Sequence, residues 1–135
     1  MLTIPERRRR VRLVALTAQA WIGLITFDAA RLAGFARIHG WLKRQRPSAR
    51  DISQPTAADI VWAVDEACVW YVKRAACLQR SVVAAWLLRR HGWPAELVIG
   101  CRPLPFESHA WVEVDGEVVN DRPQYKKVFT VLDRL

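Results

Sequence analysis

The sequence predicts an α+β fold in which helices come first and a small antiparallel sheet follows. Two observations predict it. Up to about residue 90, apolar residues recur at spacings of three and four, the period of a helix with one buried face. After residue 94 come short β-type runs, and Asp115-Gly116 between two of them is a hairpin signal. With 135 residues, 52% of them hydrophobic, the chain can bury a core as one folded unit, which excludes a disordered tail.

Three helical segments are expected, at residues 1–46, 56–74 and 77–90. The first is rich in Arg, Ala, Leu and Trp and ends in the basic run 43–46. Residues 47–55 hold two prolines and two serines, which is linker composition. Thr56, with Asp59 three residues later, is a capping signal that opens the second helix. Gly and Pro within residues 91–94 end the third helix.

Three strands are expected, at residues 95–101, 109–114 and 117–121. The last two form a hairpin, and the length of its turn decides which side chains meet. A three-residue loop at 114–116 places His109 directly opposite Asp121, with Cβ atoms about 5 Å apart. A two-residue turn would place His109 opposite Arg122 and Asp121 on the other face. We expect the three-residue loop.

The positive charge is concentrated at the start of the chain. The net charge is +8, from 21 Lys and Arg against 13 Asp and Glu, and the pI is about 10.3. The first 50 residues carry eleven of the basic side chains and only two acidic ones, so the remaining 85 sum to −1. We therefore expect a basic helical arm at 1–50 and a nearly neutral second domain at 51–135. The cluster at Arg7 to Arg12 is interpreted either as a docking element or as a solvated tail.

The apolar run Leu13 to Phe27 is shorter than the roughly 20 residues needed to cross a bilayer, and Asp28 and Arg31 follow it. We expect it to pack on the domain or a partner, and contact with a membrane surface through residues 7–46 stays an alternative. No cleavage pattern of a signal peptide follows. The three cysteines form no disulfide framework, so a cytoplasmic location is expected.

Cys77 stands where the third helix begins. Unpaired backbone N–H groups and the positive end of the helix dipole stabilise a thiolate at such a position, and Arg74 and Arg80 add positive charge. The alternative is a packed cysteine without a chemical role. With His109 on a strand and Asp121 on the next strand, Cys77 makes a Cys-His-Asp triad. The oxyanion donors stay open, with the Cys77 N–H as one candidate and the Gln79 side chain as a weak second.

Four further residues are candidates for substrate contact because they follow the nucleophile or share the histidine strand: Arg80, Ser81, Trp111 and Glu113. For Arg80 and Ser81, solvent exposure or capping is an equal alternative, and Trp111 is slightly better explained as a core residue than as a wall of the site. A zinc site built from the cysteines and histidines is disfavoured, since no CxxC or HxxxH pair exists. We therefore expect neither metal nor cofactor.

The stretch from Cys77 to Asp121 resembles the transglutaminase-like, papain-like domain of lasso-peptide B proteins, the leader peptidases of lasso-peptide biosynthesis. The matching features are Cys-Leu-x-Arg-Ser at the helix start, Leu-Leu-Arg-Arg-x-Gly-x-Pro-Ala at its end, His-Ala-Trp-Val-Glu-Val-Asp-Gly on the hairpin and a closing Asn-Asp. The resemblance covers about 45 residues closely and residues 56–135 loosely. It places the nucleophile of the family on Cys77, its histidine on His109 and its acid on Asp121.

The resemblance implies a peptidase that removes the leader from a ribosomally made precursor before a separate ATP-dependent cyclase closes a macrolactam ring. The first 46 residues show no alternating strands of the kind a leader-binding domain needs, so the chain resembles the split form, in which a separate small protein binds the leader. Two alternatives stay open. One is transglutaminase-like amide transfer, and the other is a non-catalytic basic adaptor. Nucleic acid is not an expected partner.

Overall fold

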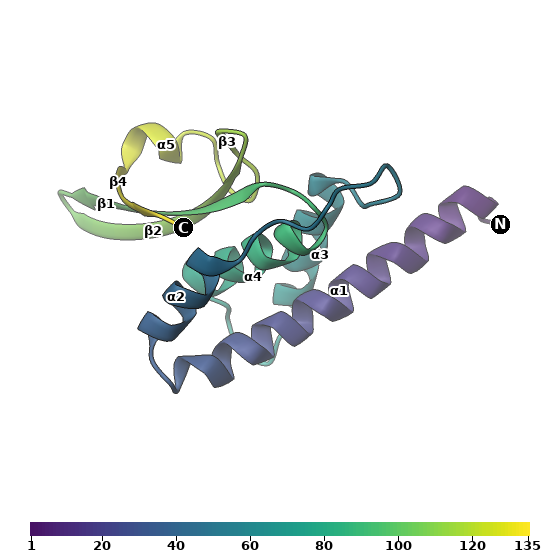
Figure 1. Cartoon of the computed structure of the whole chain (residues 1–135), viewed down its shortest axis with the longest axis horizontal. Helices are drawn as coiled ribbons and strands as arrows, with labels where there is room; N and C mark the ends of the chain where they lie inside the picture. The colour runs from purple at the N-terminus through teal and green to yellow at the C-terminus, as the bar shows by residue number, and fades with distance from the viewer.

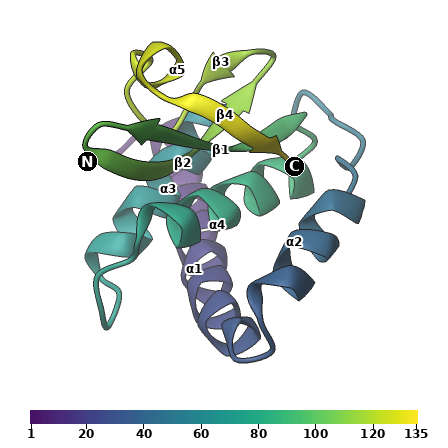
Figure 2. The same ribbon diagram turned by 90° about the vertical axis from the view of Figure 1, so that its left-hand side faces the viewer.

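The computed structural model describes residues 1–135 and shows a helical layer packed against one face of a four-stranded antiparallel sheet (Figures 1 and 2). The helices are α1 (Ile4–Arg31), α2 (Phe35–Arg44), α3 (Ala57–Val69), α4 (Cys77–Arg90) and the short α5 (Tyr125–Val128). The strands are β1 (Ala95–Pro103), β2 (Phe106–Val114), β3 (Glu117–Val118) and β4 (Thr130–Arg134), in the order β3-β2-β1-β4. The predicted α+β class is confirmed.

The helix expected over residues 1–46 is in fact two helices. α1 begins at a capping box in which Thr3 and Glu6 bond to each other's backbone N–H groups. It ends at Arg31, and Gly34, with φ of +98°, lets the chain reverse into α2. The bounds expected for α4 are confirmed. α3 ends at Val69, five residues earlier than expected.

The core contradicts the expected separation of a basic arm at 1–50 from a domain at 51–135. One cluster of 23 buried hydrophobic residues includes side chains of α1 and α2 together with those of α3, α4 and the sheet. The members from the first two helices are Leu16, Ala20, Leu24, Phe27, Ile38 and Leu42. Only the N-terminal part of α1 projects beyond the rest of the molecule (Figure 1). Residue 50 is therefore not a boundary of the core.

α1 is long and apolar enough to cross a membrane, judged by length and composition alone. The apolar run Leu13 to Phe27 is shorter than this helix, which extends from Ile4 to Arg31. A helix that packs in the core of a domain passes the same test, and the face of α1 that carries Leu16 and Leu24 is buried in this core. Length therefore does not decide the role of α1.

The turn of the β2–β3 hairpin corrects the expected register. Its loop has two residues, Asp115 and Gly116, both with positive φ, and Glu113 pairs with Val118 rather than with Glu117. A two-residue turn of this kind matches the twist of the flanking strands. The expected three-residue loop is wrong.

A buried asparagine nevertheless brings the histidine and the aspartate together. β3 ends after two residues. The Val112 N–H, which would bond to a carbonyl of a longer β3, instead donates to Asn120 Oδ1 at 2.7 Å, and Asn120 Nδ2 donates to Ser81 Oγ at 3.0 Å. Because the Asn120 side chain takes the place of the next backbone hydrogen bond of the sheet, the chain diverges from β2 after Val119. Asp121 Oδ2 then lies 2.8 Å from His109 Nε2.

The face of the sheet away from the helices has its own small core, formed by Val98, Trp111 and Phe129. Val98 and Trp111 come from β1 and β2, and the last twelve residues complete the core: α5 crosses above this face, Phe129 follows it, and β4 then pairs with β1. The local sequence predicts neither element. Both matter to the site, because the ring of His109 lies on this face among the side chains that they supply.

Candidate active site

Cys77 is the first residue of α4. The preceding Ala76 makes no side-chain cap, so the first backbone N–H groups of the helix have no side-chain partner. The cysteine is half-buried and forms no disulfide. A negative charge on its sulfur would lie at the positive end of a 14-residue helix, where thiolates and oxyanions are stabilised.

His109 and Asp121 form the hydrogen-bonded pair of this region. His109 Nε2 lies 2.8 Å from Asp121 Oδ2, and the two side chains are only 16% and 14% exposed. The imidazole also packs edge-on against the ring of Tyr125, with centroids 4.6 Å apart, and against Phe129 at 5.6 Å. A carboxylate at Nε2 favours the tautomer with the proton there, which leaves Nδ1 as the basic nitrogen. This is the orientation that a general base requires.

Arg80 ties this pair to the helix that carries Cys77. Its Nη2 lies 2.9 Å from the same Asp121 oxygen that bonds His109, and its Nη1 lies 3.8 Å from Asp65 of α3. Burial raises the pKa of Asp65, the charge of Arg80 opposes that rise, and the charge of Asp121 adds to it. Arg80 thus contacts two carboxylates, Asp65 on α3 and Asp121 in the segment that follows β3.

α4 and β2 run in the same direction, which places Cys77 at the His109 end of the strand. Ser81 Oγ donates to the Ala110 carbonyl at 3.0 Å, and at the far end Arg89 bonds to Ala95, the partner of Val114. Cys77 lies one turn before Ser81, so it projects back along β2 past Ala110. The thiol makes no hydrogen bond with His109. The structure therefore shows a His–Asp pair and, at the start of the helix that Arg80 ties to it, a free thiol.

Three of the four expected substrate contacts are corrected by burial. Ser81 and Trp111 are fully buried, and Glu113 is 3% exposed. Ser81 bonds the Ala110 carbonyl and Asn120, and Glu113 accepts from Trp111 and from Arg134. All three hold the fold and present no surface to a substrate. Arg80 contacts Asp121, so its position is that of a support for the acid.

Gln79 is also excluded as an oxyanion donor. Its Nε2 donates to the Leu24 carbonyl of α1 at 3.0 Å, and the side chain is buried. The Cys77 backbone N–H stays as the candidate. No group of three or more His, Cys, Asp or Glu side chains lies close enough to hold a metal ion.

Sequence reasoning missed four residues that shape the site: Asp65, Asn120, Tyr125 and Phe129. Asn120 had a signal, since it belongs to the closing Asn-Asp dipeptide. Asp65 lies on the α3 helix beside buried positions, and nothing in its local sequence points to Arg80. The two aromatic residues belong to α5 and its end, which has only four helical residues and no periodic pattern.

Two comparisons with known proteins give matches. The family described as the transglutaminase-like superfamily matches residues 21–134, a range that begins inside α1 and ends in β4. The chain is also 43% identical over 56 residues to the microcin J25-processing protein McjB of Escherichia coli. That match covers 42% of this chain and 27% of the relative, so the chain spans about a quarter of the length of the relative. No solved structure matches.

Proposed function

Because this chain belongs to the transglutaminase-like superfamily, we propose that it is a cytoplasmic cysteine peptidase that removes the leader from a ribosomally made lasso-peptide precursor. One observation carries the proposal: the His109–Asp121 pair is fixed by Arg80 to the same helix that begins with Cys77. The relative is named as a processing protein for microcin J25, which supports the choice of substrate.

The proposed reaction uses the thiol as nucleophile. His109 Nδ1 takes the proton of Cys77, and the thiolate attacks the peptide carbonyl at the end of the leader. Asp121 holds the ring and stabilises the imidazolium that forms. The carbonyl oxygen gains negative charge at the start of α4, near the Cys77 N–H. His109 then gives its proton to the leaving amine, the C–N bond breaks, and water hydrolyses the thioester.

The proposed partners follow from this reaction. The precursor peptide is the substrate, a separate leader-binding protein presents it, and an ATP-dependent macrolactam cyclase takes the released amine. Because His109 has no hydrogen bond to the thiol in the free protein, the proposed proton transfer requires the ring or the thiol to move when the substrate binds.

The test is to incubate the precursor with this chain and the leader-binding protein, and to weigh the products. We expect a leader with a free carboxylate and a core peptide with a new N-terminus. Cys77→Ala should abolish cleavage. Cys68→Ala should retain it, because burial raises the pKa of the Cys68 thiol and keeps that group uncharged at neutral pH.

Two outcomes would overturn the proposal. Full cleavage by Cys77→Ala would exclude the thiol mechanism. A leader that gains the mass of an amine in place of water would show amide transfer. The adaptor alternative predicts an unreactive Cys77 and binding to DNA that falls steeply with salt.

Arg80 provides a second test as a positioning residue. It neutralises part of the charge on Asp121 Oδ2, the oxygen that also holds His109. In Arg80→Gln that oxygen pairs more strongly with an imidazolium, so the acidic limb of the kcat/KM profile should move to higher pH. Arg80→Lys, which keeps the charge, should stay near the wild-type profile. A loss of stability without a shifted limb would assign Arg80 a structural role only.

A further inference from the structure

The outer side of α1 exposes an apolar stripe along most of the helix. Its members project away from the buried face that carries Leu16 and Leu24. At 100° per residue they fall within an arc of about 100° and extend over roughly 30 Å. They are Ile4, Val11, Val14, Ile22 and Ile25. An amphipathic helix of a globular domain normally presents polar residues there.

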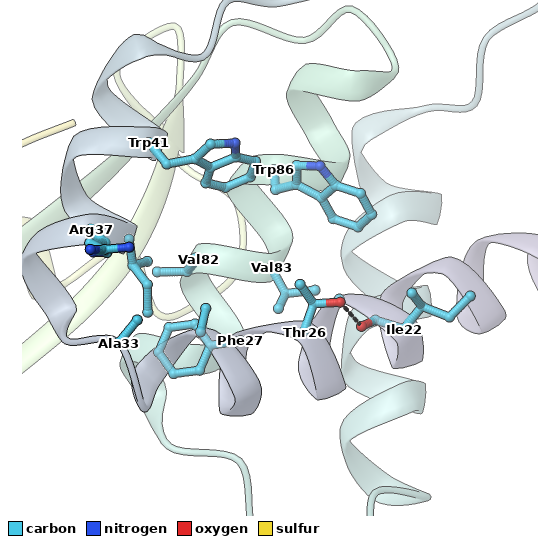
Figure 3. A pocket seen from close by; sticks show the side chains of 12 residues that line it. Ile22, Thr26, Phe27, Ala33, Arg37, Trp41, Val82, Val83 and Trp86 are labelled. Carbon is cyan, nitrogen blue, oxygen red and sulfur yellow. Dashed lines mark hydrogen bonds between the residues drawn. The ribbon is translucent and has the colours of Figure 1, made fainter.

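Two apolar grooves flank this stripe. The groove between α1 and α3 has a volume of about 840 Å³ and is lined by Trp21, Trp62 and Trp70. The pocket between α1, α2 and α4 has a volume of about 400 Å³, and Figure 3 shows Trp41 and Trp86 on one side of it. Five of the seven tryptophans therefore border one surface. We call the stripe and its two grooves the α1 face.

Most of the positive charge beside the α1 face has no ion-pair partner. Arg9 binds Asp59 at 2.9 Å, whereas Arg7, Arg8, Arg10 and Arg12 form no ion pair. The carboxylates of this region already have partners within the chain: Glu6 bonds Thr3, Asp28 bonds Lys73 and Tyr71, and Glu66 accepts from Trp70. Glu6 and Glu66 keep their negative charge because their partners are neutral, but four arginines without ion pairs outweigh them, so an occupant of this face meets a net positive charge.

The shape of the α1 face indicates which kind of partner it can bind. α1 packs on α2, α3 and α4 and lies on the side of the helical layer opposite the sheet (Figure 1). Its stripe is thus a ridge that extends outward between two shallow grooves. A ridge with apolar residues along its crest, indoles at its sides and arginines at one end fits a lipid surface, where indole rings lie at headgroup depth and arginines bind phosphates.

We propose that the α1 face docks this protein on an anionic membrane surface, with α1 lying in the plane of the headgroups. The inference does not depend on the proposed peptidase activity, because the α1 face does not include Cys77, His109 or Asp121. It gives a role to the positive charge and to the tryptophans, neither of which the catalytic residues need.

The test is sedimentation of the full chain with vesicles of phosphatidylcholine, alone or with about 30% phosphatidylglycerol. Wild type should sediment with the anionic vesicles, less with the neutral ones, and less when salt rises from about 0.15 M to about 0.5 M. Triple replacement of Arg7, Arg8 and Arg10 by Gln should weaken partitioning about 100-fold, since one arginine near the surface contributes about fivefold.

A charge in the stripe tests the apolar part. Ile22→Asp, at a position 59% exposed, should reduce binding at least about tenfold. The matched control is Leu132→Asp on β4, where the side chain is 64% exposed on the sheet side, and it should bind as wild type does. Circular dichroism checks that each variant is folded. Precursor cleavage in solution is measured in parallel, so that the membrane proposal and the peptidase proposal can fail independently of each other.

Three results would overturn the proposal. The first is no binding of wild type to anionic vesicles, and the second is equal loss in Ile22→Asp and Leu132→Asp. The third is a dimer in sedimentation equilibrium that Ile22→Asp dissociates while vesicles bind nothing, which would assign the α1 face to a second copy of the chain.

Discussion

Replacing Asn120 by Ala should destabilise the protein by about 2–4 kcal/mol. The side chain is buried and makes two bonds, accepting from the Val112 N–H at 2.7 Å and donating to Ser81 Oγ at 3.0 Å. Its removal leaves a buried backbone donor without a partner, which costs about 1–3 kcal/mol. The lost bond to Ser81 contributes about 0.5–1.5 kcal/mol more.

Urea unfolding measures this loss as a lower midpoint at unchanged slope. In a thermal melt, a domain of this size should lose about 4 °C for each kcal/mol, hence about 8–16 °C. The control is Gln124→Ala, an exposed amide whose side chain makes no cap, which should change stability by less than about 0.5 kcal/mol.

A double-mutant cycle isolates the Asn120–Ser81 bond. The two single Ala variants and the double variant should show a coupling of about 1 kcal/mol, because the two side chains are in direct contact. A loss below about 1 kcal/mol in Asn120→Ala would refute the reasoning, since it would mean that Val112 finds another acceptor. Absence of coupling would refute the contact itself.

Two further predictions concern the sheet. Gly100→Ala should destabilise by about 1–3 kcal/mol in urea, because its Cβ would lie 2.9 Å from the Trp111 ring and 3.0 Å from Phe129 Cβ; unchanged stability would contradict this packing. Although burial raises the pKa of Glu113, bonds from Trp111 and Arg134 hold it below its usual range. The ionised Glu113 side chain therefore stabilises the folded protein at pH values above its unfolded-state pKa of about 4.3. This stabilisation is lost as the pH falls through the lower pKa that Glu113 has in the folded protein. Stability of Glu113→Gln should consequently fall less between about pH 6 and pH 3.5 than that of wild type, and equal slopes would contradict it.

The parts of the fold that local signals specify were predictable. The start of α4 follows from the change of pattern at Cys77, and its end follows from Gly92, whose φ of +84° requires the residue that the sequence supplies. The break between α1 and α2 had such a signal in Gly34, but the apolar pattern on both sides outweighed it. Short elements with no periodicity, such as α5, carry no signal of that strength.

Register and burial were not predictable in the same way. The sequence allowed two turn lengths at Asp115-Gly116, and only the geometry of the flanking strands selects one. The wrong register still yielded the right pair, His109 with Asp121, because Asn120 substitutes for a strand residue. Burial of Glu113 depends on Arg134, a residue 21 positions away that no local pattern connects to it.

The structure also explains why two short motifs, more than 35 residues apart in the sequence, belong together. Cys-Leu-Gln-Arg-Ser begins α4, and Asn-Asp follows the hairpin. Arg80 bonds Asp121 at 2.9 Å and Ser81 bonds Asn120 at 3.0 Å, so each residue of the dipeptide has a partner in the first motif. One helical turn therefore carries the thiol and also fixes the segment that orients the histidine. A substitution at Arg80, Ser81 or Asn120 should therefore displace Asp121 even though it leaves Cys77 itself unchanged. The free energy of unfolding and the geometry of the His109–Asp121 pair should change together in such variants.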